Sequence, residues 1–166
     1  GVGAFRGCES LASIVIPESV TSIGSDAFIG CSNLNTIVVD KNNKVYDSRE
    51  NCNAIIETST NTLIAGCKNT TISSTVTRIG DYAFYGCKNL TSIVIPESLK
   101  SIGNRVFSEC SNLTSIVIPE SVTSIGVGAF SGCKNLTIYC ETNSKPSGWS
   151  FDWNSNLCPV KWGYKH

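Results

Sequence analysis

A 23-residue repeat constrains the fold of this chain more than any other feature of its sequence. The motif Ala-Phe-x-Gly-Cys occurs four times, and a fifth, relaxed copy is Val-Phe-Ser-Glu-Cys. A fixed period of this length is typical of solenoids, in which each turn buries its inner side chains only against neighbouring turns. The sequence therefore predicts a stack of similar turns. The motif phenylalanines, spaced by 23, 56, 23 and 23 residues, are Phe5, Phe28, Phe84, Phe107 and Phe130.

Each turn combines a short strand with a bend. The β-branched sequence Ile-Val-Ile favours a strand, and alternate residues of a strand point to opposite faces. We therefore expect Ile116 and Ile118 to point inward and Val117 to point outward. Ala129 and Phe130 are expected to fill the core from a short helical or 3₁₀ turn, which places the fold in the α/β class.

The 56-residue spacing contains one regular turn of 23 residues and one enlarged turn of 33, at about residues 34–66. A polar stretch at 40–50 carries six charges in eleven residues. Two apolar runs follow at 54–56 and 63–65, and the residues between them are rich in Thr and Asn, which indicates a β-hairpin. An insertion of this kind maps to one edge of a solenoid, where extra length is tolerated.

The two ends of the chain differ. Residues 1–8 match residues 126–133 at seven of eight positions, so we expect the chain to begin in mid-turn and to be a fragment of a longer array. Residues 136–166 depart from the repeat and are expected to form a C-terminal cap, because aromatic side chains cover an open core end well. The aromatic residues that crowd into this segment are Trp149, Phe151, Trp153 and Trp162.

The repeat Leu-x-x-Ile-x-Ile-Pro-x-x-Val-x-x-Ile-Gly-x-x-Ala-Phe-x-x-Cys resembles the BspA-like, or Treponema pallidum type, leucine-rich repeat. The resemblance covers residues 1–135 nearly throughout, and the tail at 138–163 is similar to the terminal cap of proteins from gut Gram-positive bacteria. It implies an α/β repeat solenoid: a right-handed leucine-rich-repeat coil of five turns with short parallel strands on its concave face. One enlarged, hairpin-containing turn and the aromatic C-terminal cap complete this expected fold.

Charge and composition exclude several partners. The formal net charge is zero, whereas a nucleic-acid partner requires a basic surface. No run approaches 18 apolar residues, so we expect no membrane insertion. The repeat provides no convergent metal ligands, and no cofactor is expected.

We do not expect an enzyme. The only histidine is the last residue, His166, so a Ser-His-Asp or Cys-His arrangement cannot form in a stable interior. The carboxylates of Glu18, Glu97 and Glu120 share one repeat position, and a row about 5 Å apart resembles a glycosidase pair only superficially. A residue repeated in this way is far more often a consensus surface position.

The nine cysteines fall into classes. Five occupy one inward repeat position: Cys8, Cys31, Cys87, Cys110 and Cys133. Parallel side chains in such a ladder neither converge on a metal nor meet disulfide geometry, so we expect small buried hydrophobes. Cys67 is expected to be buried likewise, and Cys52 lies in the insertion without a predicted place. Cys140 and Cys158 flank the cap, where a disulfide would close an irregular segment.

The outward side chains of the strands are the first candidate for a binding surface. Hydroxyl side chains form one column, and a second column, which we call the valine stripe, consists of Val15, Val38, Thr71, Val94 and Val117. An exposed valine stripe beside hydroxyls suits protein binding, although β-branched residues also stabilise any strand. The charged insertion at 40–50 is an equal candidate. The hydroxyl column consists of Ser13, Thr36, Ser92 and Ser115.

The resemblance implies a secreted or surface-attached bacterial protein that takes part in adhesion. We expect a non-catalytic binding module whose partners are host or matrix proteins, or other bacterial surface proteins. Glycans are an alternative class of partner, as for an accessory module. A structural spacer that presents another domain is the alternative function.

Overall fold

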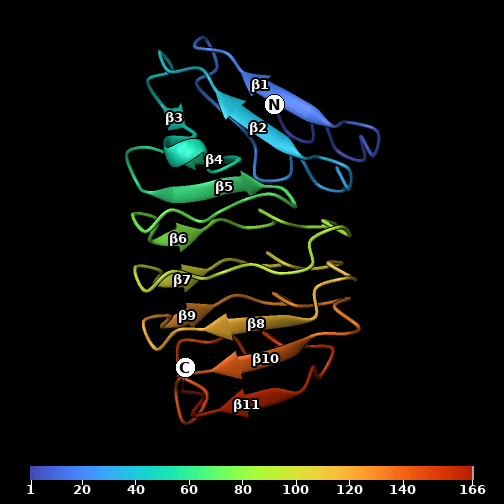
Figure 1. Ribbon diagram of the computed structural model, residues 1–166, viewed down its shortest axis with the longest axis vertical. Helices are drawn as coiled ribbons and strands as arrows, with labels where there is room; N and C mark the ends of the chain where they lie inside the picture. Colours follow the sequence, from blue (N-terminus) through green and yellow to red (C-terminus); the bar gives the residue numbers. More distant parts are fainter. Residues whose placement is uncertain (166) are drawn as a thin grey trace.

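The structure, a computed structural model, describes residues 1–165 and is a β-solenoid of about seven turns. His166 lies outside the described residues. The turns stack along one axis from the N-terminal to the C-terminal end (Figure 1). The repeat thus predicted the architecture correctly, whereas the expected number of five turns was too low.

The expected α/β class is wrong. Within residues 1–165 the one helical element is a 3₁₀ helix, η1 (Arg49–Asn51). The Ala-Phe-x-Gly-Cys segments are tight turns, because their glycines adopt the left-handed conformation, with φ of +72° for Gly86 and +79° for Gly132. Their hydrogen bonds also run to the next turn of the stack, as from Phe107 N to Ala129 O at 2.8 Å.

One side of the stack carries the expected parallel strands, but in two separate sheets. The turns between these sheets, at 69–72 and 92–95, form no strand. The N-terminal sheet contains β1 (Ser13–Ile16) and β2 (Thr36–Val39). The C-terminal sheet contains β8 (Ser115–Ile118), β10 (Thr137–Cys140) and β11 (Val160–Trp162), with β10 in the centre.

Another side of the stack carries a six-stranded sheet in the order β3-β4-β5-β6-β7-β9. Its first three strands belong to the enlarged turn and are antiparallel, which confirms the predicted hairpin: β3 (Tyr46–Asp47), β4 (Ala54–Glu57) and β5 (Thr62–Gly66). The rest are two-residue parallel strands from successive turns: β6 (Arg78–Ile79), β7 (Ser101–Ile102) and β9 (Ser124–Ile125).

The hairpin β4–β5 crosses the interior and divides the core in two. Ile55 and Ala65 pack with the N-terminal turns, whereas Ile56 and Leu63 pack with the C-terminal turns. A strand that is buried on both faces has a continuous apolar sequence instead of an alternating one. This explains the unbroken runs at 54–56 and 63–65.

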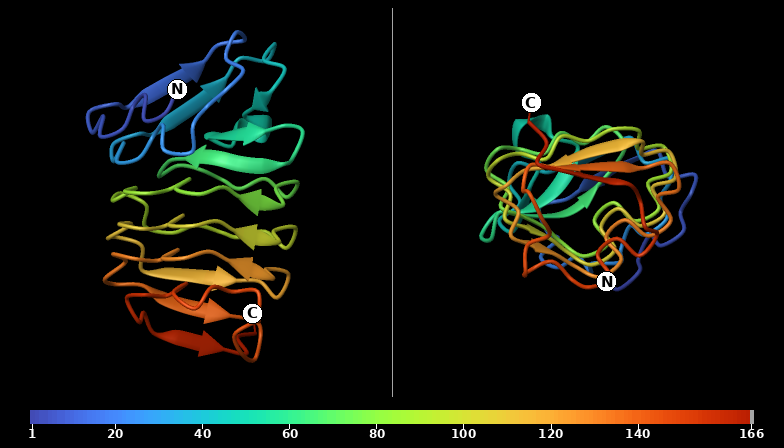
Figure 2. Two further views of the ribbon diagram at one scale, coloured as in Figure 1. Left: turned by 180° about the vertical axis from the view of Figure 1, so that it is seen from behind. Right: turned by 90° about the horizontal axis from the view of Figure 1, so that it is seen from below.

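The insertion opens the stack on one edge only. Turns 27–31 and 83–87 remain in direct contact, since Gly30 N donates to Tyr85 O at 3.2 Å. Next to this bond, the carbonyl of Ala83 accepts from Gly66 N at 2.9 Å, so the hairpin occupies the place of the preceding regular turn. The enlarged turn thus acts as a wedge, and β1 and β2 are inclined to the strands below them (Figure 2).

Stacked phenylalanine rings form the centre of the C-terminal core. The rings of Phe84 and Phe107 are 5.3 Å apart, and those of Phe107 and Phe130 are 5.7 Å apart. Trp153 continues the column with an edge-on contact to Phe130 at 5.9 Å. Trp149 and Trp153 of the predicted aromatic cluster therefore cover this end of the core, 4.7 Å apart, whereas Phe151 is 94% exposed and does not take part. The coil nevertheless continues through the cap, since β11 adds a parallel strand to β10.

Candidate functional site

The residues predicted for the binding surface lie on the outer face of the strands. Val15 pairs with Val38, and Ser13 pairs with Thr36, so both columns run in register across β1 and β2. The residues that are exposed are Ser13, Val15, Thr36, Val38, Thr71, Ser92, Val94 and Ser115, whereas Val117 is half-buried.

The valine stripe is exposed but not straight. Val94 is 82% exposed and Val15 is 65% exposed. Because β1 and β2 are inclined and residues 92–95 form no strand, the stripe bends in the middle. At its C-terminal end Tyr139 pairs with Val117, and Lys161 pairs with Tyr139. Strand alternation at 138–140 could have predicted that Tyr139 continues this outward column. Lys161 could not be predicted in this way, because it lies beyond the repeat.

A groove of about 640 Å³ joins the two surfaces that the sequence presented as alternatives. One wall is strand β2, and the other is the insertion around β3 and η1. Val38 contributes an apolar side chain that is 44% exposed, and Lys41 contributes an exposed cation. Val38 of the valine stripe and residues of the charged insertion therefore line the same groove. The lining residues used below are Thr36, Val38, Asp40, Lys41, Asp47 and Arg49.

An ion pair fixes the insertion wall of the groove. Arg49 binds Asp47 through two hydrogen bonds, Nε to Oδ1 at 2.8 Å and Nη2 to Oδ2 at 2.6 Å. The same guanidinium donates to Asn61 and Thr75, at 2.8 and 3.0 Å. Burial alone would raise the pKa of Asp47, but hydrogen bonds from Arg49 and Thr58 and the charge of Arg49 lower it overall. Asp47 and Arg49 are thus internally paired, and they position the wall.

Asn43 attaches the start of the insertion to the turn before it. Its Nδ2 donates to the carbonyls of Pro17 and Val20 at 2.9 and 3.0 Å. Its Oδ1 accepts from the backbone N–H groups of Val45 and Tyr46 at 2.9 and 2.8 Å. The sequence analysis missed this residue, although Asn is typical of turns that bond to their own backbone. These bonds make the insertion an ordered wall instead of a solvated loop.

The cysteine ladder is buried and hydrogen-bonded. The thiols of Cys31, Cys110 and Cys133 donate to a phenylalanine carbonyl 26 residues earlier, at 3.1, 3.2 and 3.0 Å. Burial raises the pKa of Cys87 and Cys133 to about 12, so these thiols are poor nucleophiles. The expectation of small buried side chains is confirmed for four members.

The remaining five cysteines have different outcomes. Cys8 is exposed, because it lies in the end turn. Cys67 is buried, as expected, and Cys52, for which no place was predicted, is buried as well. The suggested bridge between Cys140 and Cys158 does not form, and both are free thiols. The register places Cys158 opposite residue 136, and four residues of strand, roughly 13 Å, separate it from Cys140. A disulfide requires Cα atoms within about 7 Å.

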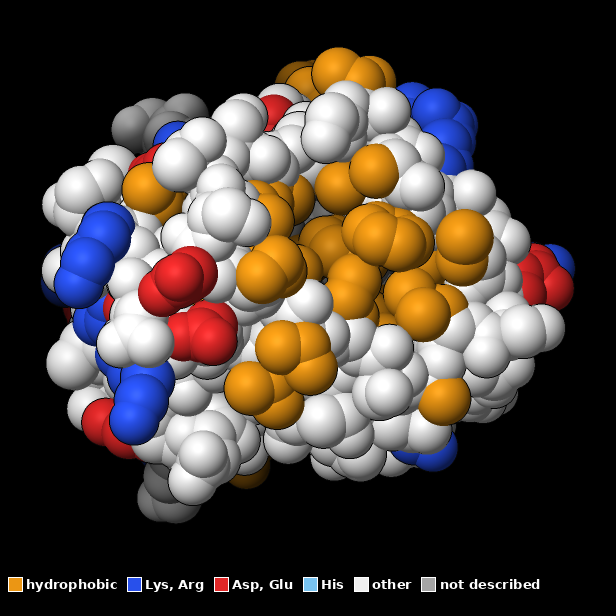
Figure 3. Space-filling model, turned by 90° about the horizontal axis from the view of Figure 1, so that it is seen from above, with side chains coloured by type: hydrophobic (Ala, Val, Ile, Leu, Met, Phe, Trp, Pro, Cys, Tyr) orange, Lys and Arg blue, Asp and Glu red, His pale blue; other side chains and the backbone are white. Residues whose placement is uncertain are grey.

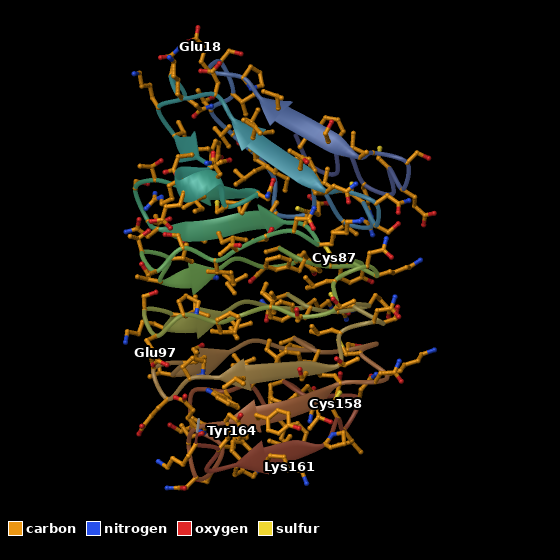
Figure 4. All side chains as sticks on the ribbon, viewed as in Figure 1. Glu18, Cys87, Glu97, Cys158, Lys161 and Tyr164 are labelled. Atoms are coloured by element: carbon orange, nitrogen blue, oxygen red, sulfur yellow. The ribbon has the colours of Figure 1, made fainter. Side chains whose placement is uncertain are left out.

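The glutamate row lies on the surface. Glu18 and Glu97 lie on widely separated turns (Figure 4), and Glu97 and Glu120 are exposed. Within residues 1–165, no group of three or more His, Cys, Asp or Glu side chains is placed to hold a metal ion. The same residues include no helix with the length and apolar character needed to cross a membrane.

Comparison with known proteins identifies the repeat. The family profile "BspA type Leucine rich repeat region (6 copies)" matches residues 1–61 and 55–151. A leucine-rich repeat protein from Eubacterium ventriosum has 32% identity and a TM-score of 0.66 over 82% of this chain. A leucine rich cell surface protein from Faecalibacterium prausnitzii has 26% identity and a TM-score of 0.56 over 94% of it.

A further solved structure, the pneumococcal vaccine antigen PcpA, shares the fold at 19% identity and a TM-score of 0.59 over 92% of this chain. The chain spans only 38%, 49% and 43% of the length of these three structures, in the order given. No curated protein matches the chain significantly.

Proposed function

This chain belongs to the BspA-type leucine-rich repeat family, and from that premise we propose that it is a non-catalytic, extracellular binding module of a bacterial surface or secreted protein. A relative of 26% identity is described as a cell surface protein, which supports the proposed location. In this proposal the coil is right-handed, and the side that carries β1, β2, β8, β10 and β11 is its concave binding face.

One observation carries the proposal: the groove between β2 and the insertion. It combines an exposed apolar side chain, Val38, with the exposed cation of Lys41 and the hydroxyl of Thr36. Protein interfaces combine apolar contacts with hydrogen-bonding rims in this way. Since the valine stripe leads into the groove, the partner we propose is a protein that contacts an extended face. A glycan, which would use the hydroxyl and amide groups of the groove, is the alternative partner.

The proposal is tested by binding to a panel of purified extracellular-matrix proteins and to a glycan array. Val38→Lys alters the groove, and Val94→Lys is its matched control at the same repeat position outside the groove. Both side chains are exposed, so both variants are expected to fold. We expect Val38→Lys to weaken binding by about tenfold or more and Val94→Lys to change it by less. Equal loss in both variants would place binding on the whole stripe instead of the groove.

A structural spacer and an enzyme remain the alternatives to this function. A spacer predicts no binding to any member of the panel and no effect of either lysine variant. An enzyme predicts turnover of a glycan substrate that is lost in the double variant Glu97→Gln, Glu120→Gln. Absence of binding by the wild-type chain would therefore contradict the binding proposal and favour the spacer.

A further inference from the structure

The side of the stack that carries β2 and β8 is interrupted between these two strands (Figure 1). Residues 89–98 have the same sequence as residues 112–121, which contain β8, yet residues 92–95 form no strand. Among residues 1–165, no hydrogen bond joins the main chain of residues 91–95 to another residue. Because the two sequences are identical, the neighbouring turns and not the local sequence cause this interruption.

The turn before the interruption, at 68–72, is bonded to the insertion instead. Thr71 N donates to Cys52 O at 3.0 Å, and Cys52 belongs to the enlarged turn. A cleft of about 320 Å³ lies between residues 68–72 and 92–94. It shares no lining residue with the groove beside β2, so it is a separate surface.

The unpaired main-chain groups of Ser92 and Val94 point toward this cleft. In β2, the residues at the same repeat positions face the preceding turn, as the bond from Thr36 N to Ala12 O at 3.3 Å shows. Every second residue of a strand points its N–H and C=O groups to the same side. Ser92 and Val94 are both exposed. The segment therefore presents an open strand edge, which is a template for pairing with another strand.

Lys68 gives the cleft a positive charge. Its side chain is exposed and forms no ion pair within residues 1–165, and no acidic residue lines the cleft. The cleft thus differs from the hydrophobic surface seen at the N-terminal end of the stack (Figure 3), because main-chain groups and a cation line it. An occupant that satisfies it supplies main-chain hydrogen bonds, an apolar side chain for Val94 and a negative charge for Lys68.

We propose that this cleft binds an extended, acidic peptide segment of a partner protein, which pairs as a strand with residues 91–95 and places a carboxylate beside Lys68. Main-chain bonds to Ser92 and Val94 supply the affinity in this mode of recognition, and side-chain contacts supply the specificity. Five residues of strand span roughly 16 Å, so a short peptide covers the edge. The proposal does not rest on the groove beside β2, and either surface can bind without the other.

The test uses synthetic peptides and needs no natural partner. Two acetylated and amidated hexapeptides alternate Thr and Val and carry one Glu, at the first position or at the last, so that both strand directions are sampled. The controls are the same peptides with N-methylated main chains and with Gln in place of Glu. Calorimetry measures binding, and hydrogen exchange of residues 91–95 locates it.

We expect at least one Glu peptide to bind and to slow exchange at residues 91–95, and its N-methylated form to bind about tenfold more weakly or worse. Lys68→Gln is expected to weaken the Glu peptide by about two- to fivefold and to leave the Gln peptide unchanged. Absence of binding up to about 1 mM, or equal binding of the N-methylated peptide, would overturn the proposal. Neither result bears on the groove variants.

Two proline variants locate the contact on the protein. Ser92→Pro removes an N–H group that points toward the cleft, and its matched control Ser115→Pro removes the corresponding group of β8. Neither group is bonded to another turn, and urea unfolding checks that both variants fold. We expect Ser92→Pro to weaken the peptide about tenfold and Ser115→Pro to leave it unchanged, whereas equal effects would contradict the proposal. If Ser92→Pro instead changed the sedimentation of the chain without peptide, the cleft would belong to a second copy of the chain and the proposal would fail.

Discussion

At the scale of single residues, two backbone positions in the repeat adopt a left-handed conformation, and one of them is glycine in all copies but one. Gly7, Gly30, Gly86 and Gly132 occupy it with φ between +72° and +79°. In the relaxed copy Glu109 stands at this position and adopts φ of +62°. A side chain in this region costs about 1 kcal/mol or more. The glutamate in this copy therefore strains the backbone locally.

Replacing Glu109 by glycine is expected to stabilise the protein by about 1 kcal/mol, because glycine adopts positive φ without strain. Urea unfolding measures the change as a higher midpoint at an unchanged slope. The competing effect is loss of the Glu109 side chain, which lies over Gly132 in the next turn, with Oε1 2.6 Å from where a Cβ on Gly132 would be. A lower midpoint would show that this contact outweighs the strain.

Gly66 shows a different constraint, which is space. It lies where the hairpin meets the phenylalanine stack, and a Cβ there would overlap the ring of Phe84. Phe84 is fully buried and has no room to move away. Gly66→Ala is therefore expected to destabilise the fold by about 3 kcal/mol, as overpacked cores do. Gly1→Ala, which has no atom within 4 Å of the added methyl group, is the control, and equal stability of the two variants would contradict the packing described.

At the scale of elements, the enlarged turn determines both the shape of the stack and the groove. Its hairpin separates the two cores, and its polar part forms a groove wall held by Asn43 and by the pair of Asp47 and Arg49. The sequence predicted the hairpin from its two apolar runs. It did not predict that the hairpin acts as a wedge, because that depends on the two turns between which the hairpin inserts. The unbroken apolar runs were a usable signal that both faces are buried.

The pair of Asp47 and Arg49 makes the stability of the insertion dependent on pH. Because the pKa of Asp47 is lowered in the folded protein, its contribution is present above the unfolded pKa of about 3.9. It is lost as pH falls through the lower folded value. Asp47→Asn is therefore expected to reduce Tm at pH 7, with the difference from wild type shrinking below about pH 4. A difference that stays constant from pH 7 to pH 2 would show that the ion pair contributes nothing.

At the scale of the whole molecule, the repeat determines the stacking and one irregular turn determines the surface. The period predicted phenylalanines that fill the core and a ladder of buried cysteines, which holds for every ladder member except Cys8, because each inner copy repeats the same environment. The α/β class was wrong because the left-handed glycines end each turn before a helix forms. The sequence could not show that the valine stripe and the charged insertion meet at one groove, because the groove depends on the tilt between turns.

The candidate site was predicted in part for the same reason. Exposure of Val15 and Val38 follows from strand alternation, which the sequence shows directly, whereas Val94 is exposed although residues 92–95 form no strand. The anchoring roles of Asn43 and Arg49 depend on partners such as Pro17 and Thr75, each 26 residues away in the chain. Contacts between residues so far apart in the chain are determined by how the turns stack, and no local sequence pattern indicates them.

The most direct test of the central claim, that the irregular turn forms the binding surface, is hydrogen exchange of the chain with and without a partner found in the binding panel. We predict that the partner slows exchange mainly in residues 36–43 and 47–53, which contain most of the residues that line the groove. Residues 113–118 in β8 and the preceding turn are expected to change little. Protection confined to 113–118, or absent from 36–53, would contradict this account.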